Sequence, residues 1–507
     1  MIIYKQKDYA REREFSAEVV VVGTGAGGAV AGALLAEAGF DVIFVEEGGY
    51  HPTSSFSPYL AESQPRLYRD NGTTVIMGNP PIPFAEGRCV GGSTVINGGM
   101  AWRPISEVLD TWENELGYEM GEKGLDPYFT EVEETIHAKK QAPYSIGDDN
   151  RIMKKGAEKL GWEYLDNVRA QDRCVGANSC IVGCPTGAKQ STLVSYIPRA
   201  FEAGARCLTE LRVDELIIEG GRCRGVIGRG VNPATRQDEE RVIVRGRIVI
   251  LAAGAIQTPN ILLQYRSLRK NKNLGGNFLC HPNAKVVSRF PYDVKGWQGV
   301  SQGGQIREFR DEGIVLAENF IPPAVMAAQI HGHGDEVWET MRHYNRLIAC
   351  GVLVEDTRPG RVTRSFGRPN ARYNITKIDH ERFLKGVELL ARLHFEMGAE
   401  KVYLPFSNLT SIESPDQLPL IKKTQRSRSS LELFTVHMMG TARMGLSRRD
   451  SVVNLDGELW DLPGCFVADA SLFPTAVGTN PQVTIMALAA KVAERIAGKR
   501  AAFLATA

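Results

Sequence analysis

The 507-residue sequence contains no uninterrupted apolar run near the roughly 18 residues that a membrane-spanning helix requires. Its first sixteen residues are polar, so we expect neither a secretory leader nor a twin-arginine signal. An excess of charge is also lacking, since 60 basic side chains stand against 59 acidic ones, which argues against nucleic acid or an anionic membrane surface as a partner. We therefore expect a cytoplasmic protein, without a transmembrane segment, that binds a small molecule.

Low-complexity tracts and fixed-period repeats are missing too, and an apolar share of 43% is typical of folded globular chains. The nine cysteines occur without a secretory leader, which indicates a reducing compartment where thiols serve as ligands, reactants or small apolar side chains. The length exceeds the roughly 250–300 residues at which single hydrophobic cores stop growing. Two or more domains are therefore expected.

The N-terminal segment has the pattern of a βαβ unit. The valine-rich residues 18–22 predict a buried strand, the Ala- and Leu-rich residues 29–38 a helix, and residues 41–45 a second strand. The glycine-rich turn 23–28 joins the first strand to the helix. Strand, glycine turn, helix and second strand in this order predict a dinucleotide site.

Each position of this unit has an expected role. Gly23 permits the tight turn, Gly25 lets a pyrophosphate approach the backbone, and Gly28 lets helix and strand pack closely. The phosphate is expected at the helix N-terminus, beside Ala26. Glu46 follows the second strand and is placed to accept hydrogen bonds from the adenosine ribose. This fingerprint alone does not separate FAD from NAD.

Six further segments have the form of sequence motifs, namely residues 88–98, 248–259, 274–282, 435–445, 466–471 and 474–481. They resemble the signature motifs of the glucose–methanol–choline (GMC) oxidoreductases and favour FAD. The resemblance implies a combined α/β and α+β fold. A Rossmann-like FAD-binding domain would be joined to a substrate-binding domain built on an antiparallel sheet.

The same resemblance implies which residues contact the cofactor. In addition to the βαβ positions, these are Gly91, Gly92, Ser93, Asn97, Val213, Ala253, Gly254, Asp469, Ala470, Asn480 and Pro481. Family members with histidine-linked flavin carry the histidine directly before the asparagine of the first loop, where this chain has Ile96. We therefore expect non-covalent FAD.

The C-terminal motifs resemble the catalytic segments of the family. They imply that His437 is the base that takes the hydroxyl proton of an alcohol, and that Asn480 donates to the substrate oxygen while flavin N5 receives the hydride. Residues 183–192 resemble long-chain alcohol oxidases and their bacterial relatives. The expected activity is oxidation of a hydrophobic primary or secondary alcohol to an aldehyde or ketone.

The order of the motifs predicts a discontinuous FAD-binding domain formed by residues 1–105, 190–290 and 440–507. Residues 291–439 are expected to form the substrate-binding domain. The polar segment 106–189 is expected to be rich in loops and to extend over the flavin and the entrance.

Two alternatives stay open at this level. Fold does not fix chemistry, and hydroxynitrile lyases and a light-driven fatty-acid decarboxylase also resemble this family, so a redox-neutral reaction is the first. The second is a flavin subunit of a respiratory dehydrogenase, which passes electrons through an iron–sulfur cluster to an electron-acceptor protein or small subunit.

Three cysteines raise the second alternative. Cys174, Cys180 and Cys184 stand in a C-x5-C-x3-C-P pattern that resembles the three-iron (3Fe–4S) cluster site in flavin subunits of bacterial sugar dehydrogenases. Long-chain alcohol oxidases have related cysteine-rich loops without an established cluster. A zinc site or structural thiols are the other interpretations of this pattern.

Overall fold

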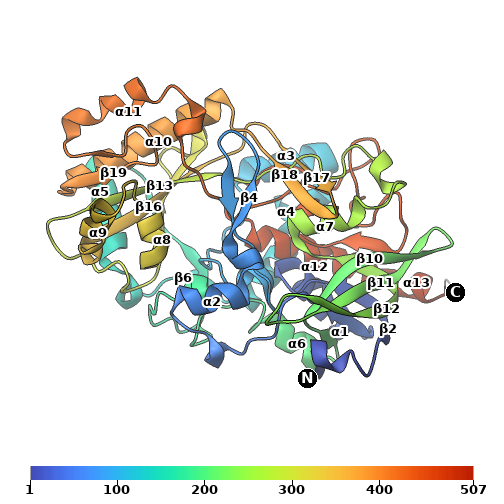
Figure 1. Ribbon diagram of the computed structural model, residues 1–507. Coiled ribbons are helices and arrows are strands. Elements are labelled where there is room, and N and C mark those ends of the chain that lie inside the picture. Colours follow the sequence, from blue (N-terminus) through green and yellow to red (C-terminus); the bar gives the residue numbers. More distant parts are fainter. Residues whose placement is uncertain (1, 506–507) are drawn as a thin grey trace.

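The computed structural model describes residues 2–505 and shows two lobes (Figure 1). The lobe with both chain ends is built on an eight-stranded sheet, in which β21 (Cys465–Val467) pairs with β12. The other strands follow the order β1 (Ile2–Tyr4), β9 (Arg206–Leu208), β3 (Val42–Val45), β2 (Glu14–Val22), β12 (Asp238–Leu251), β11 (Arg222–Val231) and β10 (Leu211–Glu219).

The centre of this sheet is the predicted βαβ unit. Strands β2 and β3 are parallel neighbours, and α1 (Ala26–Glu37) connects them. The valines of β2 are buried because the sheet is covered on both faces, as a parallel sheet requires. Helix α12 (Gln482–Gly498) packs against α1, so the C-terminal end of the chain completes the layer that begins at the N-terminus.

Strand β12 joins two kinds of sheet. Its first half pairs antiparallel with β11, and its second half pairs parallel with β2, which brings the β10–β12 meander to the parallel core. The strand ends at Leu251 and leads through a short turn into α7 (Gly254–Leu262). The carboxyl ends of β2 and β12 therefore lie side by side, which is where parallel sheets bind ligands.

The second lobe is built on an antiparallel sheet, as expected. Its strands follow the order β20 (Ser411–Ile412), β19 (Lys401–Tyr403), β13 (Asn283–Arg289), β16 (Leu347–Val354), β15 (Ile314–Glu318), β14 (Gly304–Ile306) and β7 (Tyr164–Asp166). Helices α5 (Asp148–Leu160) and α10 (Lys377–Glu396) cover one face of this sheet. Ile314, Leu316 and Val352 point into that covered face and form its core.

Two strands lie in this second sheet although their residues fall outside the range expected for the substrate-binding domain. Strand β13 begins at Asn283, ahead of the expected boundary at 290, because the chain leaves the cofactor lobe after the His281–Pro282 step. Strand β7 comes from the segment 106–189 and pairs with β14. The chain therefore enters the second lobe earlier than the motif order suggests.

The segment 106–189 is also less rich in loops than expected. It contains α3 (Ser106–Leu116), α4 (Glu122–Thr135) and α5. Val108, Leu109 and Trp112 recur at helical spacing and are buried on one face of α3, so apolar periodicity outweighs the polar composition of this segment.

Shorter elements complete the chain. They are α2 (Leu60–Leu67), β4 (Thr74–Ile76), β5 (Ile82–Phe84), β6 (Ala138–Lys140), β8 (Val168–Ala170), α6 (Tyr196–Glu202), α8 (Pro323–Ala328), α9 (Asp335–Met341), β17 (Arg361–Ser365), β18 (Arg368–Arg372), α11 (Pro419–Thr424) and α13 (Arg500–Ala505). The β4–β5 hairpin stands between the two lobes (Figure 1). Within residues 2–505 no helix combines the length and apolarity needed to cross a membrane.

Candidate active site

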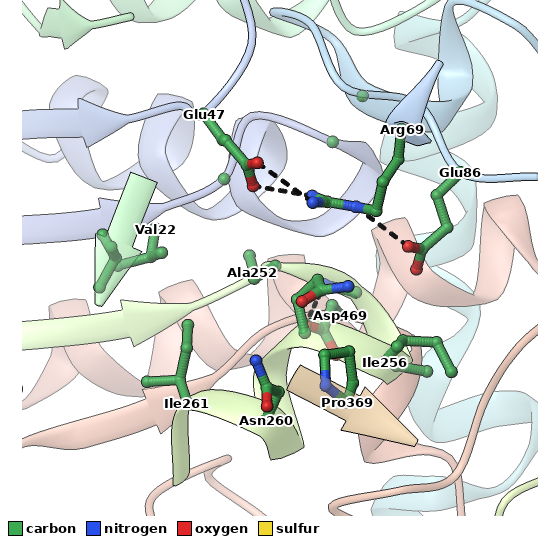
Figure 2. A pocket seen from close by; sticks show the side chains of 18 of the residues that line it. Val22, Glu47, Arg69, Glu86, Ala252, Ile256, Asn260, Ile261, Pro369 and Asp469 are labelled. Atoms are coloured by element: carbon green, nitrogen blue, oxygen red, sulfur yellow. Dashed lines mark hydrogen bonds and ion pairs between the residues drawn. The ribbon is translucent and has the colours of Figure 1, made fainter. Parts of the chain in front are cut away.

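A cavity of about 980 Å³ opens at the carboxyl ends of β2 and β12. This volume lies at the upper end of the roughly 300–1,000 Å³ that small-molecule and cofactor sites occupy. Its wall combines the glycine turn after β2, the turn after β12, strand β10 and the segment around Asp469 (Figure 2). Elements far apart in the sequence thus form one elongated site.

Twelve of the sixteen residues expected to contact the cofactor line this one cavity. They are Gly23, Gly25, Ala26, Glu46, Gly92, Ser93, Val213, Ala253, Gly254, Asp469, Ala470 and Pro481. Gly28, Gly91, Asn97 and Asn480 lie in the surrounding structure and are described below.

The glycine turn has the shape that a pyrophosphate needs. A Cβ atom on Gly28 would lie 2.1 Å from the Gly23 carbonyl oxygen, so Gly28 allows the close packing predicted for it. A Cβ atom on Gly25 would meet only the Cα of Gly92, at 3.9 Å, because this position faces the cavity. Gly25 therefore leaves backbone accessible where a phosphate would approach the N-terminus of α1.

Glu46 holds the glycine turn as well as lining the cavity. Its Oε2 accepts from the Thr24 backbone N–H at 3.0 Å and from the Thr24 hydroxyl at 2.6 Å, and its Oε1 accepts from the Gly48 N–H at 2.8 Å. Gly91 N–H donates to the same Thr24 hydroxyl at 3.1 Å. Burial raises the pKa of Glu46, whereas these hydrogen bonds oppose the shift.

The charged side chains at one wall of the cavity are paired with each other. Arg69 lies between Glu47 and Glu86, at 2.9 and 3.2 Å (Figure 2). At the β10 wall, Arg212 contacts Asp214 at 3.0 Å. Since Arg69 and Arg212 are already paired with carboxylates, the backbone N–H groups of the glycine turn are better placed than these two side chains to donate to a pyrophosphate.

Asp469 joins two of the cavity's turns. Its Oδ2 accepts from the Gly254 N–H at 2.8 Å and from the Thr258 hydroxyl at 2.5 Å, and its Oδ1 accepts from the Ser471 N–H at 2.7 Å. The carboxylate is buried, and this burial raises its pKa. Asp469 therefore fixes the start of α7 against the C-terminal segment.

A buried lysine, Lys189, holds the loop that carries Asn97. Lys189 Nζ donates to the carbonyl oxygens of Val95, Asn97 and Cys180, at 2.6, 2.9 and 2.6 Å. Asn97 itself donates to Gln482, at the start of α12, and its Oδ1 accepts from the Gly99 N–H at 3.0 Å. This lysine was not predicted, because the sequence shows no pattern that pairs residue 189 with residues 95–97.

The structure brings together the two residues expected to be catalytic. Asn480 Nδ2 lies 3.2 Å from His437 Nε2, although 43 residues separate them. Val436 and Met438, on either side of His437, line the large cavity, as does Pro481 after Asn480. The pair therefore lies next to residues of the cavity wall, although neither side chain lines the cavity itself.

His437 is uncharged at neutral pH. Burial lowers its pKa to about 3, with smaller contributions in the same direction from the nearby His281 and Lys285. Its Nδ1 is buried without a hydrogen-bond partner within the described residues. An imidazole in this state is able to accept a proton over the whole physiological range.

His281 is a site residue that the sequence reasoning missed. Its ring stands edge-on to that of His437, with centroids 5.9 Å apart, and its Nε2 lies 4.0 Å from Asp356. Residues 279–283 run antiparallel to residues 434–439, which places the two histidines opposite each other. The signal was the His-Pro step of the 274–282 motif, but a sequence motif does not reveal which distant strand it will face.

The structure does not support the iron–sulfur interpretation of the cysteines. Cys174, Cys180 and Cys184 do line one small cavity, but within residues 2–505 no three His, Cys, Asp or Glu side chains are grouped so as to hold a metal ion. Cys180 Sγ accepts from Arg169 at 3.4 Å, and Cys184 Sγ accepts from the Lys189 backbone N–H at 3.4 Å. The thiols are thus engaged with protein groups, and close spacing along the chain did not make them a ligand set.

Comparison with known proteins agrees with this geometry. Two family models described as GMC oxidoreductase match residues 64–283 and 356–489. A GMC-type oxidoreductase of Sinorhizobium fredii is 33% identical over 497 residues, which cover 95% of both chains. A long-chain-alcohol oxidase of Arabidopsis thaliana is 26% identical over 533 residues, which cover 96% of this chain and 68% of the plant protein.

Solved structures show the same fold. Formate oxidase of Aspergillus oryzae superposes with a TM-score of 0.74 at 17% identity, covering 97% of this chain and all of that one. Pyridoxine 4-oxidase superposes with a TM-score of 0.71 at 18% identity, covering 94% and 98% of the two chains. At these identities the structural matches bear on the fold and leave the substrate open.

Proposed function

The chain belongs to the GMC oxidoreductases, and we propose that it oxidises an alcohol to an aldehyde or ketone with non-covalently bound FAD as hydride acceptor. The observation that carries this proposal is the contact of His437 with Asn480 beside residues that line a cavity of cofactor size. An unprotonated imidazole beside an amide supplies the two polar functions that alcohol oxidation needs. These are a proton acceptor and a donor to the substrate oxygen.

The two residues divide the work on the substrate hydroxyl. His437 Nε2 accepts the hydroxyl proton, and the low pKa of His437 keeps this nitrogen unprotonated before the substrate binds. The Asn480 amide donates to the substrate oxygen as negative charge develops there. FAD, when bound, accepts the hydride that leaves the carbinol carbon.

The expectation of non-covalent FAD rests on residue 96. Ile96 is buried in the apolar core, so this position offers no nucleophile to the flavin. The glycine turn, Glu46 and strand β10 supply a complete cradle by packing and hydrogen bonding instead. We therefore propose that affinity alone retains the cofactor.

A hydrophobic primary or secondary alcohol is the substrate class that the relatives favour. The support is the similarity to plant long-chain-alcohol oxidases over most of this chain. The resemblance of residues 183–192 to the same class of enzymes adds to it.

The test is anaerobic reduction of the holoenzyme's flavin by a panel of aliphatic, aromatic and sugar alcohols, followed by admission of oxygen. We expect aliphatic or aromatic alcohols to bleach the flavin absorbance. A flavin that stays oxidised with every alcohol would contradict the proposal and favour redox-neutral chemistry. Slow recovery of absorbance in oxygen would indicate that another molecule, such as an electron-acceptor protein, takes the electrons.

A further inference from the structure

The antiparallel sheet turns one face away from α5 and α10, and this face is uncovered except at the end where α8 packs on Val287 and Ala349. Along β13, Asn283 and Lys285 share this face, because side chains two apart on a strand point the same way. Their partners across β16 are Leu353 and Gly351. Val315, on β15, pairs with Leu353 and extends the same face.

This face looks toward the catalytic histidine. Val315 and Leu353 line a small cavity together with His281 and Gly478, which stands two residues before Asn480. Asn283 exchanges two backbone hydrogen bonds with Phe434, both of 2.8 Å, three residues before His437. The uncovered face of the sheet is therefore a wall of the substrate side of the active site.

Polar groups gather at one place on this wall. Lys285 Nζ donates to Asn319 Oδ1. A Cβ atom on Gly351 would lie 2.7 Å from Asn319 Oδ1 and 2.8 Å from Asn283 Nδ2, so this glycine leaves the space in which the two amides and the ammonium group meet. Asn283 Oδ1 is buried without a partner among the described residues, so nothing in the protein fixes this amide, and turned about its last bond it presents its N–H groups to an acceptor.

The ammonium group of Lys285 has no carboxylate partner within residues 2–505. Glu318 is the carboxyl group whose charge acts on the pKa of Lys285. Its side chain nevertheless points to the covered face, where it accepts from the Gln302 N–H at 2.9 Å and hydrogen-bonds to Asp149. Burial, together with the neighbouring Asp149, raises the pKa of Glu318 well above its usual range, which disfavours a negative charge on this group. Burying a cation without an anion beside it costs free energy, and a ligand that supplies the anion would remove this cost.

We propose that Lys285, positioned by Asn319 and assisted by the Asn283 amide, binds a carboxylate of the substrate, so that the preferred alcohol is a hydroxy acid whose hydroxyl group reaches His437. The inference rests on the proposed function and names its substrate more closely. One ammonium group flanked by neutral amides matches a single negative charge better than the double charge of a phosphate. The apolar side chains of Val315 and Leu353 on the same wall suit an aliphatic chain between carboxylate and hydroxyl.

Lysine protonation supports this assignment. Burial lowers the pKa of Lys285 to about 8, so the group is charged at neutral pH and loses its proton in mildly alkaline solution. Preference for an anionic substrate should therefore weaken as the pH rises through 8. A role in folding alone would not produce this dependence.

The experiment compares ω-hydroxy acids of three to ten carbons with their methyl esters, which have the same chain and no charge. Anaerobic flavin reduction by wild-type holoenzyme should favour the best acid over its ester by about 10–100-fold, the range of a hydrogen bond to a charged group. Lys285→Met should abolish this preference, so that acid and ester reduce the flavin of the variant at rates within about threefold of each other. Lys285→Arg should retain much of the preference and should not lose it near pH 8.

Lys401→Met is the matched control, because Lys401 lies on the same sheet in β19 but pairs with Glu413 at 3.0 Å. It should keep the wild-type preference. If Lys285→Met does not fold, a binding experiment on wild-type holoenzyme replaces it. Hexanoate and 1-hexanol are titrated separately, and changes in the flavin absorbance spectrum report their binding. At neutral pH hexanoate should bind more tightly than 1-hexanol, and its binding should weaken as the pH rises above 8.

Three outcomes are distinguishable. Equal reduction by acids and esters, or a preference that survives in Lys285→Met, overturns the carboxylate site while leaving alcohol oxidation standing. Equal or weaker binding of hexanoate than of hexanol overturns it as well. If neither acids nor esters nor simple alcohols bleach the flavin, the proposed function itself fails, and the carboxylate site fails with it.

Discussion

Asn480 and His437 lie side by side, with 3.2 Å between the amide nitrogen and the imidazole Nε2. The pair is assembled by the C-terminal segment alone, yet its surroundings come from both lobes. We expect His437→Ala to slow flavin reduction by alcohols about 10²–10⁴-fold, as for a positioned general base. Asn480→Ala should lose roughly 10²–10³-fold, as for a single oxyanion donor. Stopped-flow reduction measures both, and unchanged FAD binding is the control. Near-normal reduction in either variant would remove that residue from the mechanism.

The pH dependence of reduction tests the state of the base. The pKa of His437 lies near 3 because of burial, so the imidazole is already unprotonated at pH 5. Reduction by a neutral alcohol should therefore stay level between pH 5 and pH 8. A loss of rate with a midpoint near 6.5 would show an ordinary histidine and contradict the buried geometry.

Two glycines of the turn should respond differently to alanine. In Gly25→Ala the new methyl group points into the cavity and meets no protein atom closer than 3.9 Å, so the apoprotein should unfold at an unchanged temperature while FAD affinity falls. In Gly28→Ala the methyl group would stand 2.1 Å from a backbone oxygen, so stability itself should fall. Thermal unfolding of apoprotein and titration with FAD separate the two effects. Equal FAD affinity in Gly25→Ala would show that the cofactor does not approach this turn.

Lys189 should stabilise the loop that carries Asn97, although its side chain does not line the large cavity. Lys189→Met leaves three carbonyl oxygens without their shared donor, which predicts a loss of roughly 2–4 kcal/mol in stability, since a buried charged hydrogen-bond donor is removed. Lys139→Met is the control, because Lys139 is exposed and pairs with exposed Asp172. Chemical denaturation measures both variants. Equal effects would mean that the carbonyl cluster contributes little.

A buried carboxyl pair gives the protein a pH-dependent stability. Burial raises the pKa of Asp149 to about 6 and that of Glu318 well above its usual range, and the two groups hydrogen-bond. Both folded-state pKa values exceed the unfolded ones, so the folded protein binds more protons, and stability falls as the pH rises through about 6. Glu318→Gln removes one carboxyl group, and its unfolding free energy should fall less between pH 5 and pH 8 than that of wild type. An unchanged slope would contradict the pairing.

Local patterns predicted the cofactor lobe well. The valine run, the glycine turn and the second strand are contiguous, so their order along the chain determines their packing, and β2, α1 and β3 confirm it. Strand β2 begins at Glu14, four residues before the predicted start, because its first part pairs with the antiparallel half of β12. That extension depends on a partner more than 200 residues away.

The substrate side of the site could not be predicted in the same way. His281 and Lys285 reach His437 through the pairing of residues 279–283 with 434–439, a register that no local pattern specifies. The cysteines show the reverse case, in which a local pattern suggested a metal site that the structure does not support. Spacing along the chain does not fix where each Sγ points. Helix α3, in contrast, had a readable signal in Val108, Leu109 and Trp112 that the polar composition obscured.

Acid precipitation tests how the flavin is held. Since Ile96 offers no atom for a covalent bond, trichloroacetic acid should release all yellow colour into the supernatant. Colour that stays with the protein pellet would require an attachment site elsewhere in the cavity.

The most direct test of alcohol oxidation is anaerobic stopped-flow reduction by an alcohol with hydrogen or deuterium at the carbinol carbon. Hydride loss from that carbon predicts bleaching of the flavin that is several-fold slower with deuterium. It also predicts that bleaching by either substrate nearly disappears in His437→Ala. Bleaching at the same rate with both isotopes and in the variant, or no bleaching by any alcohol, would contradict the account.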